Sequence, residues 1–242
     1  KRTFEGYFKR IIIAGDGVEA LQLVRSHVPD IIVSDVMMPR MNGYKLCKTI
    51  KEDINISHIP VILLTARDDR QSQISGYKNG ADGYLSKPFE VEMLMELIRN
   101  RLKNREYTKK RYLNAGLIPT PEESTISLTD ETFLIKLNSI IQENIENSNL
   151  GIQFICQEVG LGRSSLYNKL KALTGMGANE YISKLRIEKA ITLISGTDMP
   201  FSEIAEKTGF TTPSYFSTAF KQYTGETPSQ YKERKKKGLA DK

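Results

Sequence analysis

The amino-acid sequence predicts a doubly wound α/β domain followed by an all-α domain that contains two helix-turn-helix motifs. In the first hundred residues, short apolar runs alternate with amphipathic stretches roughly every 20–30 residues, the rhythm of parallel strands joined by helices. Further along, every periodic segment is helical, and one stretch recurs about 50 residues later. We therefore expect an α/β domain at 1–104, a linker at 105–128 and a helical domain at 129–242.

Four apolar runs are predicted to be strands of the α/β domain. They lie at 10–14, 30–34, 60–65 and 83–86, and the first three are rich in β-branched residues. None alternates polar with apolar residues, which is typical of strands that are buried on both faces of a parallel sheet.

Amphipathic stretches around these runs are predicted to be helices. In the stretch 17–27 apolar residues recur at helical spacing, and Asp16 is placed to cap its N-terminus. The stretch 44–53 follows an Asn-Gly turn. The stretch 90–102 begins with glutamates and ends with arginines, as the helix dipole favours. Residues 1–9 are predicted to belong to a still earlier helix.

Composition indicates a soluble protein whose C-terminal part is basic. No apolar run approaches the roughly 20 residues of a membrane span, so we expect a cytoplasmic segment without membrane contact. Cys47 and Cys156 lie far apart, which predicts a reducing compartment and neither a disulfide framework nor a metal site. Residues 151–242 hold 14 Lys and Arg against 9 Asp and Glu, which favours a polyanionic partner.

Three polar residues follow or end successive predicted strands. Asp35 follows the run 30–34, Thr65 ends the next and Lys87 follows the last. Ligands of open α/β sheets bind beyond the carboxyl ends of the strands, so these side chains are expected at one edge. A carboxylate can attack a phosphoryl group, and a cation and a hydroxyl can stabilise the transferred charge. Each residue alone could equally be a strand-end cap or a solvated charge.

Residues 10–103 resemble the response-regulator receiver domain of two-component signalling, which has a flavodoxin-like fold. The motifs that carry the resemblance are SDVMMP at 34–39 with NG at 42–43, LTA at 64–66, GAD at 80–82 and YLSKPF at 84–89. The resemblance implies that Asp35 is the phosphoacceptor and a ligand of Mg²⁺, and that Met37 offers its backbone carbonyl to the metal. It implies that Thr65 and Lys87 hold the phosphoryl group and that Tyr84 is the switch aromatic.

The sequence departs from the receiver pattern at its beginning. Receivers begin with a strand that carries an acidic pair, and this pair completes the Mg²⁺ site. The first strand and the pair are absent from this sequence, and Asp16 is no substitute because it begins a helix. Mg²⁺ is therefore expected only when the acidic pair is present. The resemblance also implies a cis bond between Lys87 and Pro88. The expected protein partners are a histidine kinase or phosphodonor domain and, as a further candidate, a second copy of the chain in a homodimer.

The helical half contains an internal repeat. ICQEVG at 155–160 matches IAEKTG at 204–209, and KALTGMGANEY at 171–181 matches KQYTGETPSQY at 221–231. Each copy reads as a short helix, a turn at glycine and a second helix, which is a helix-turn-helix. Between the copies, residues 178–195 read as one long amphipathic helix that could hold two recognition helices in successive major grooves.

The second helix of each copy has an apolar stripe and an outward polar face. The expected stripes are Leu166, Leu170 and Leu173, and Phe216, Phe220 and Tyr223. The expected DNA-binding residues are Arg163, Ser164, Tyr167, Asn168 and Lys171 in the first copy, and Thr212, Ser214, Ser217, Thr218 and Lys221 in the second. A face without carboxylates suits the major groove, although an ordinary solvated surface is the alternative for either copy alone.

Residues 130–236 resemble the AraC-type DNA-binding domain, in which a long helix joins two helix-turn-helix motifs. Together the two resemblances imply a bacterial transcription regulator of a two-component phosphorelay that binds double-stranded DNA and is controlled by aspartyl phosphorylation. No enzyme activity is expected beyond self-phosphorylation and autodephosphorylation. The linker resembles that of hybrid two-component proteins, so the chain would be the C-terminal part of a hybrid sensor kinase and the cytoplasmic part of a membrane-bound sensor.

Two other functions fit parts of the sequence. The receiver could be a dimerisation module of a regulator that works without phosphorylation, which the absent acidic pair favours. An α/β phosphohydrolase could use Asp35 as its nucleophile, but such enzymes place a second aspartate two residues further on, where this chain has Met37. The sequence also has no GxxxxGK[ST] loop, which argues against a nucleotide hydrolase.

Overall fold

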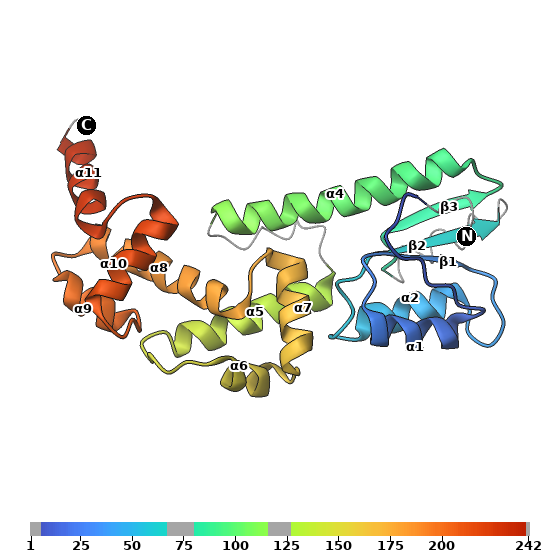
Figure 1. The fold of residues 1–242 in the computed structure, drawn as a ribbon, viewed down its shortest axis with the longest axis horizontal. Coiled ribbons are helices and arrows are strands. Elements are labelled where there is room, and N and C mark those ends of the chain that lie inside the picture. The colour runs from blue at the N-terminus through green and yellow to red at the C-terminus, as the bar shows by residue number, and fades with distance from the viewer. Residues whose placement is uncertain (1–5, 67–79, 116–126, 241–242) are drawn as a thin grey trace. The chain divides into compact units, whose positions relative to one another are not determined.

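The computed structural model describes residues 6–66, 80–115 and 127–240, drawn in colour in Figure 1. These residues form two compact units. The first consists of residues 6–110 and 127–131, and the second of residues 111–115 and 132–240. Residues 1–5 of the expected first helix and residues 116–126 of the expected linker lie outside the described part.

The first unit is built on a parallel sheet with the strand order β1-β2-β3 (Figure 1). The strands are β1 (Ile32–Asp35), β2 (Val61–Ala66) and β3 (Gly83–Lys87). They confirm three of the four predicted strands. Helices α1 (Gly17–His27) and α2 (Gly43–Glu52) follow the predicted stretches, and Asp16 caps α1 by accepting hydrogen bonds from the backbone amides of Val18 and Glu19.

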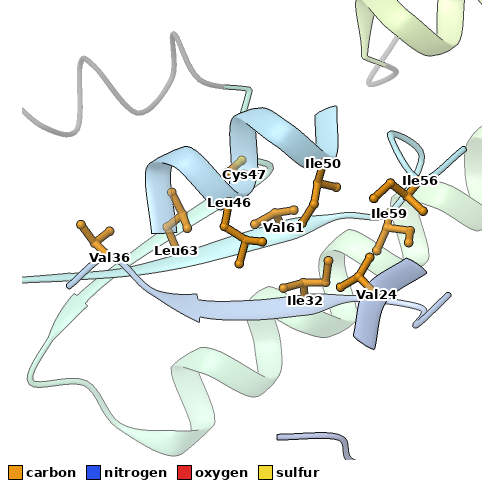
Figure 2. Close-up of a cluster of buried hydrophobic side chains, with 10 residues drawn as sticks. All are labelled: Val24, Ile32, Val36, Leu46, Cys47, Ile50, Ile56, Ile59, Val61 and Leu63. Atoms are coloured by element: carbon orange, nitrogen blue, oxygen red, sulfur yellow. The ribbon is translucent and has the colours of Figure 1, made fainter. Parts of the chain in front are cut away.

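Strand β2 is buried on both faces, which is the physical basis of the doubly wound arrangement. Successive side chains of a strand point to opposite faces of the sheet. Val61 and Leu63 therefore join the cluster that α1, α2 and β1 contribute to (Figure 2), whereas Ile62 joins a second cluster with the side chains of α4 (Val91–Ala115). Burial of each such aliphatic side chain stabilises the fold by about 1.5–3 kcal/mol.

The predicted strand at 10–14 is wrong. Residues 11–14 are irregular, and Ile13 is 60% exposed. A strand exists only where a neighbouring backbone completes its hydrogen bonds. Within the described residues β1 pairs with β2 alone, so this apolar run does not complete its backbone hydrogen bonds on the free edge of β1. The expected early helix is also not formed over its described part, because residues 6–9 make a turn and a single bridge at Phe8.

Helix α4 is longer than predicted and includes residues 105–115 of the expected linker. The stretch 91–115 contains no proline or glycine, and its Lys, Arg, Glu and Leu residues favour helix, so nothing ends the helix at 104. The first turn of α5 (Leu128–Glu143) belongs to the first unit. There the buried carboxylate of Asp130 accepts a hydrogen bond of 2.7 Å from the hydroxyl of Ser57. Domain limits at 104 and 129 stay a prediction.

The second unit is helical, as the sequence predicts. After α5 it contains α6 (Ile152–Val159), α7 (Arg163–Thr174), α8 (Ala178–Gly196), α9 (Phe201–Lys207), α10 (Pro213–Thr224) and α11 (Pro228–Ala240). The pairs α6–α7 and α9–α10 are the two copies of the repeat, and α8 joins them (Figure 1). Thr212 caps α10 by accepting a hydrogen bond from the amide of Tyr215, and Thr227 and Gln230 cap each other at the start of α11.

Replacing Gly43 should destabilise the first unit. A Cβ at this position would lie 2.3 Å from the carbonyl oxygen of Asp35, so Gly43→Ala must displace the backbone at the end of β1. We expect a loss of about 1–3 kcal/mol in the free energy of unfolding, measured by urea denaturation with a probe of the first unit. Gly15→Ala is the matched control, because its Cβ would meet only the flexible carboxylate of Glu19, at 3.3 Å. Equal stability of the two variants would contradict the close approach.

Candidate functional site

The register of the sheet brings the ends of the three strands to one edge. Asp35 is opposite Leu64 in β2, so Thr65 lies one residue beyond it, and Ala66 is opposite Lys87 in β3. The ammonium of Lys87 forms an ion pair with the Oδ2 atom of Asp35. The structure thus brings two of the predicted residues into contact and puts Thr65 on the strand between them.

The carboxylate of Asp35 is held in its charged form. Partial burial acts to raise its pKa, but the hydrogen bond from Lys87 and that from the amide of Met37, which is 3.1 Å from Oδ1, outweigh this effect. The pKa of Asp35 therefore lies below its usual range. An ionised and still accessible carboxylate is the form that can act as a nucleophile.

The hydroxyl of Thr65 has no partner within the described residues. The side chain is 1% exposed, and its Oγ1 atom makes no hydrogen bond to any described residue. Buried polar groups in native proteins are nearly always hydrogen-bonded, and leaving one unsatisfied costs about 1–3 kcal/mol. A hydroxyl at a strand end beside a carboxylate and an ammonium is therefore placed to receive an acceptor such as a phosphoryl oxygen.

The residues between β1 and α2 form a tight turn. Gly43 approaches the strand end closely, and its amide donates to the carbonyl of Val36 at 3.0 Å. Asn42 caps α2 by accepting from the amide of Lys45. The tight turn leaves Met37 79% exposed, and its backbone amide donates a hydrogen bond to the carboxylate of Asp35.

Tyr84 and the bond before Pro88 complete the receiver-like features. The ring of Tyr84 is half-buried and packs against the hydrophobic cluster of α1, α2 and β2. The bond between Lys87 and Pro88 is cis, as the resemblance implied.

The described residues do not form a complete Mg²⁺ site. No group of three or more His, Cys, Asp and Glu side chains among them could hold a metal ion. Asp35 supplies one carboxylate, whereas Asp16 caps α1 and is paired with Arg40. Mg²⁺ usually takes one or two carboxylates together with phosphate oxygens, so Asp35 supplies only part of a ligand set for the ion.

The predicted DNA-binding residues lie on the outer sides of α7 and α10. All five on α7 are exposed, while Leu166, Leu170 and Leu173 are buried, as expected. In the second copy Ser217 is half-buried and the other four are exposed. The exposed ones are Thr212, Ser214, Thr218 and Lys221.

Three features of these helices were not predicted. Tyr223, expected in the apolar stripe, is 40% exposed, and its hydroxyl donates to Glu188 at 3.2 Å. Tyr215, at the start of α10, is an exposed aromatic that is not among the predicted DNA-binding residues. Lys169 is completely buried and lies over the ring of Phe133 at 5.1 Å. The apolar neighbours of Lys169 in the sequence were the available signal that it lies on the inner side of α7.

Comparison with known proteins matches both halves of the chain. The profile of the response regulator receiver domain matches residues 3–99, and that of a helix-turn-helix domain matches residues 155–234. The chain is 30% identical to the probable transcriptional regulator ycf29 of Pyropia yezoensis, over 70% of the chain and 82% of that protein. It is 28% identical to the transcriptional regulatory protein HptR of Staphylococcus aureus, over 93% of the chain and 88% of that protein.

The chain belongs to the response-regulator family. Its helix-turn-helix domain, with two motifs joined by α8, is of the AraC type, so the chain combines a receiver domain with a DNA-binding domain. It is also 42% identical over 93% of its length to histidine kinase P4 of Formosa agariphila, but spans only 16% of that protein. No helix in the described part of this response regulator is both long and apolar enough to cross a membrane.

The pKa of Asp35 should depend on Lys87. We expect Lys87→Met to raise the pKa of Asp35 toward its ordinary value, because the partial burial then acts without the opposing cation. Since the pKa is depressed in the folded state, the pair stabilises the fold above the ordinary carboxyl pKa, and this contribution is lost as the pH falls through the folded-state value. Carboxyl chemical shifts in an NMR titration report the change. Lys48→Met, which removes an exposed lysine of the same unit, should leave the Asp35 titration unchanged.

Proposed function

We propose that this chain regulates transcription under the control of phosphorylation at Asp35. The observation that carries the proposal is the charged, accessible carboxylate of Asp35 beside Lys87 and the unsatisfied hydroxyl of Thr65, in a chain that also has two helix-turn-helix motifs. An oxygen of Asp35 attacks the phosphorus of a phosphodonor, the bond to the leaving group breaks, and an acyl phosphate forms. Lys87 then interacts with the phosphoryl oxygens, and Thr65 donates a hydrogen bond to one of them.

Mg²⁺ is expected to take part only where an acidic pair accompanies Asp35. When bound, the ion would neutralise charge on the phosphoryl oxygens, and we propose that Asp35 and the backbone carbonyl of Met37 are among its ligands. Tyr84 is proposed as the aromatic side chain that responds to phosphorylation. No enzyme activity on a separate substrate is proposed.

The phosphodonor is proposed to be a histidine kinase or a phosphotransfer domain. The similarity to histidine kinase P4 over 93% of the chain supports a place within a hybrid sensor, in which the kinase and the regulator share one polypeptide. We propose a cytoplasmic location for this part, because DNA and the phosphodonor are found there.

A second candidate is a regulator whose receiver serves only for dimerisation. It is favoured by the lack of a complete Mg²⁺ ligand set among the described residues. Phosphohydrolase activity is disfavoured, because the residue two positions after Asp35 is the exposed Met37 and cannot act as an acid or base.

Phosphorylation at Asp35 can be tested by mass. We expect acetyl phosphate and Mg²⁺ to add one phosphoryl group, about 80 Da, to a chain extended at its N-terminus with a receiver strand that carries an acidic pair. Asp35→Asn should abolish this gain. Asp53→Asn, which removes an aspartate that is paired with Arg25 elsewhere in the unit, should leave it intact. An unmodified parent chain would instead favour the dimerisation module.

DNA binding is proposed to use the outer sides of α7 and α10. These sides carry hydroxyls, an amide and cations, which suit base edges and phosphates. Arg163, at the first position of α7, is proposed to contact guanine or phosphate, and Lys171 and Lys221 to contact phosphates. Helix α8 has 19 residues and a length of about 28 Å, comparable to the roughly 34 Å between successive major grooves.

The salt dependence of DNA binding tests these roles. Against duplexes that the chain selects from a random pool, we expect the dissociation constant to rise steeply with salt concentration. Lys171→Ala or Lys221→Ala should weaken binding and make the logarithmic salt slope shallower by about 1, because one phosphate contact is lost. Lys207→Ala on α9 is the control, because it removes an exposed lysine that is not among the proposed contacts. A slope that is unchanged in both test variants would contradict the assignment.

A further inference from the structure

The turn of the second helix-turn-helix motif lies directly against the loop that follows α5. A Cβ at Gly209 would lie 2.1 Å from the carbonyl oxygen of Ile145, so the two backbones are in contact at this point. The same Cβ would lie 2.9 Å from the Nη2 atom of Arg186. Since Ile145 precedes the first motif and Gly209 is the turn of the second, the contact joins the two halves of the DNA-binding domain directly.

Arg186 of α8 holds this contact from the side. Its guanidinium donates a hydrogen bond of 2.8 Å to the carbonyl of Asn147, in the same loop, and lies over the ring of Phe210 at 5.9 Å. One side chain of the connecting helix thus binds the loop before the first motif and the turn of the second. An ion pair of 3.2 Å between Lys189 and Glu146 fixes the loop to α8 one turn further on.

The contact continues into the recognition helix of the second motif. The ring of Phe210 packs edge-on against Tyr215, with ring centres 5.7 Å apart, and lies tilted against Phe216, at 5.4 Å. Phe216 is completely buried in the core of this half, and Tyr215 is on the first turn of α10. A shift of the turn at Gly209 would therefore move the start of α10.

The first copy of the repeat lacks this arrangement. Gly160 is the equivalent turn residue and has the same left-handed backbone, with φ +72° against +73° at Gly209. No atom of the described residues lies within 4 Å of a Cβ built at Gly160. The turn itself therefore needs the glycine backbone in both copies, but only the second copy needs the absence of a side chain.

We propose that Ile145, Asn147, Arg186, Gly209 and Phe210, here called the interlock, fix α10 relative to the first motif and so set the separation of the two DNA half-sites that the domain accepts. The inference rests on the proposed DNA binding for its consequence, but not for its mechanical part. A long helix alone would leave the two motifs free to twist and bend about it. Arg186 and Gly209 are positioning residues that need not touch DNA.

The mechanical part can be measured without DNA. Spin labels at Gln153→Cys on α6 and Ser202→Cys on α9, both exposed, report the distance between the motifs by pulsed electron paramagnetic resonance, in a full chain whose buried Cys47 and Cys156 are replaced by alanine. We expect a narrow distance distribution that broadens or shifts in Gly209→Ala and Arg186→Ala. Gly160→Ala is the matched control, because it carries the same backbone strain without the contact, and it should leave the distribution unchanged. Identical distributions in all variants would overturn the interlock.

The consequence for DNA is read from half-site spacing. The chain and each variant are titrated with a selected duplex and with the same duplex carrying five extra base pairs between the half-sites. We expect the insertion to weaken binding by the parent chain and by Gly160→Ala at least about tenfold, because half a helical turn moves one half-site out of reach. The penalty should fall to about threefold or less in Gly209→Ala and Arg186→Ala. An equal penalty in all chains would refute the role in half-site spacing. A parent chain that selects no DNA would refute the proposed function, and the distance distributions measured by electron paramagnetic resonance would then be the test of the interlock.

Discussion

The parallel register of β1, β2 and β3 is the constraint on which the receiver site depends. Parallel strands place their carboxyl ends at one edge, so residues that are distant in sequence meet there without any further device. Asp35 and Lys87 are 52 positions apart and form an ion pair, and Thr65 ends the strand between theirs. The register is itself fixed by burial on both faces of β2, where a slip of one residue would exchange Ile62 with the side chains of the opposite cluster.

The two units place their polar and charged side chains in different ways. The receiver places two opposite charges at the strand ends, and the buried hydroxyl of Thr65 beside them has no acceptor among the described residues. The helical unit spreads polar and basic side chains over two outer sides and keeps the carboxylates off them. The contacts of Arg186 and Gly209 fix the placement of its two motifs relative to each other.

Many of the helices, strands and site residues could be predicted from local sequence patterns. The predictions that are wrong have physical causes. Asp16 caps α1 as expected, because capping depends on a few adjacent residues. The run 10–14 has the composition of a strand but pairs with none of the described strands, and pairing is not a local property. The contact at Gly209 depends on segments far apart in the chain, so neither periodicity nor the repeat itself indicates it.

Beryllium fluoride, a tetrahedral mimic of the phosphoryl group, tests directly whether Asp35, Thr65 and Lys87 together bind a phosphoryl group. In a crystal structure of the chain extended with a receiver strand that bears the acidic pair, soaked with beryllium fluoride and Mg²⁺, we expect an adduct on a carboxylate oxygen of Asp35. The hydroxyl of Thr65 and the ammonium of Lys87 should each lie within about 3.2 Å of its fluorine atoms. An adduct on another carboxylate, or one that leaves the Thr65 hydroxyl without a partner, would contradict this prediction.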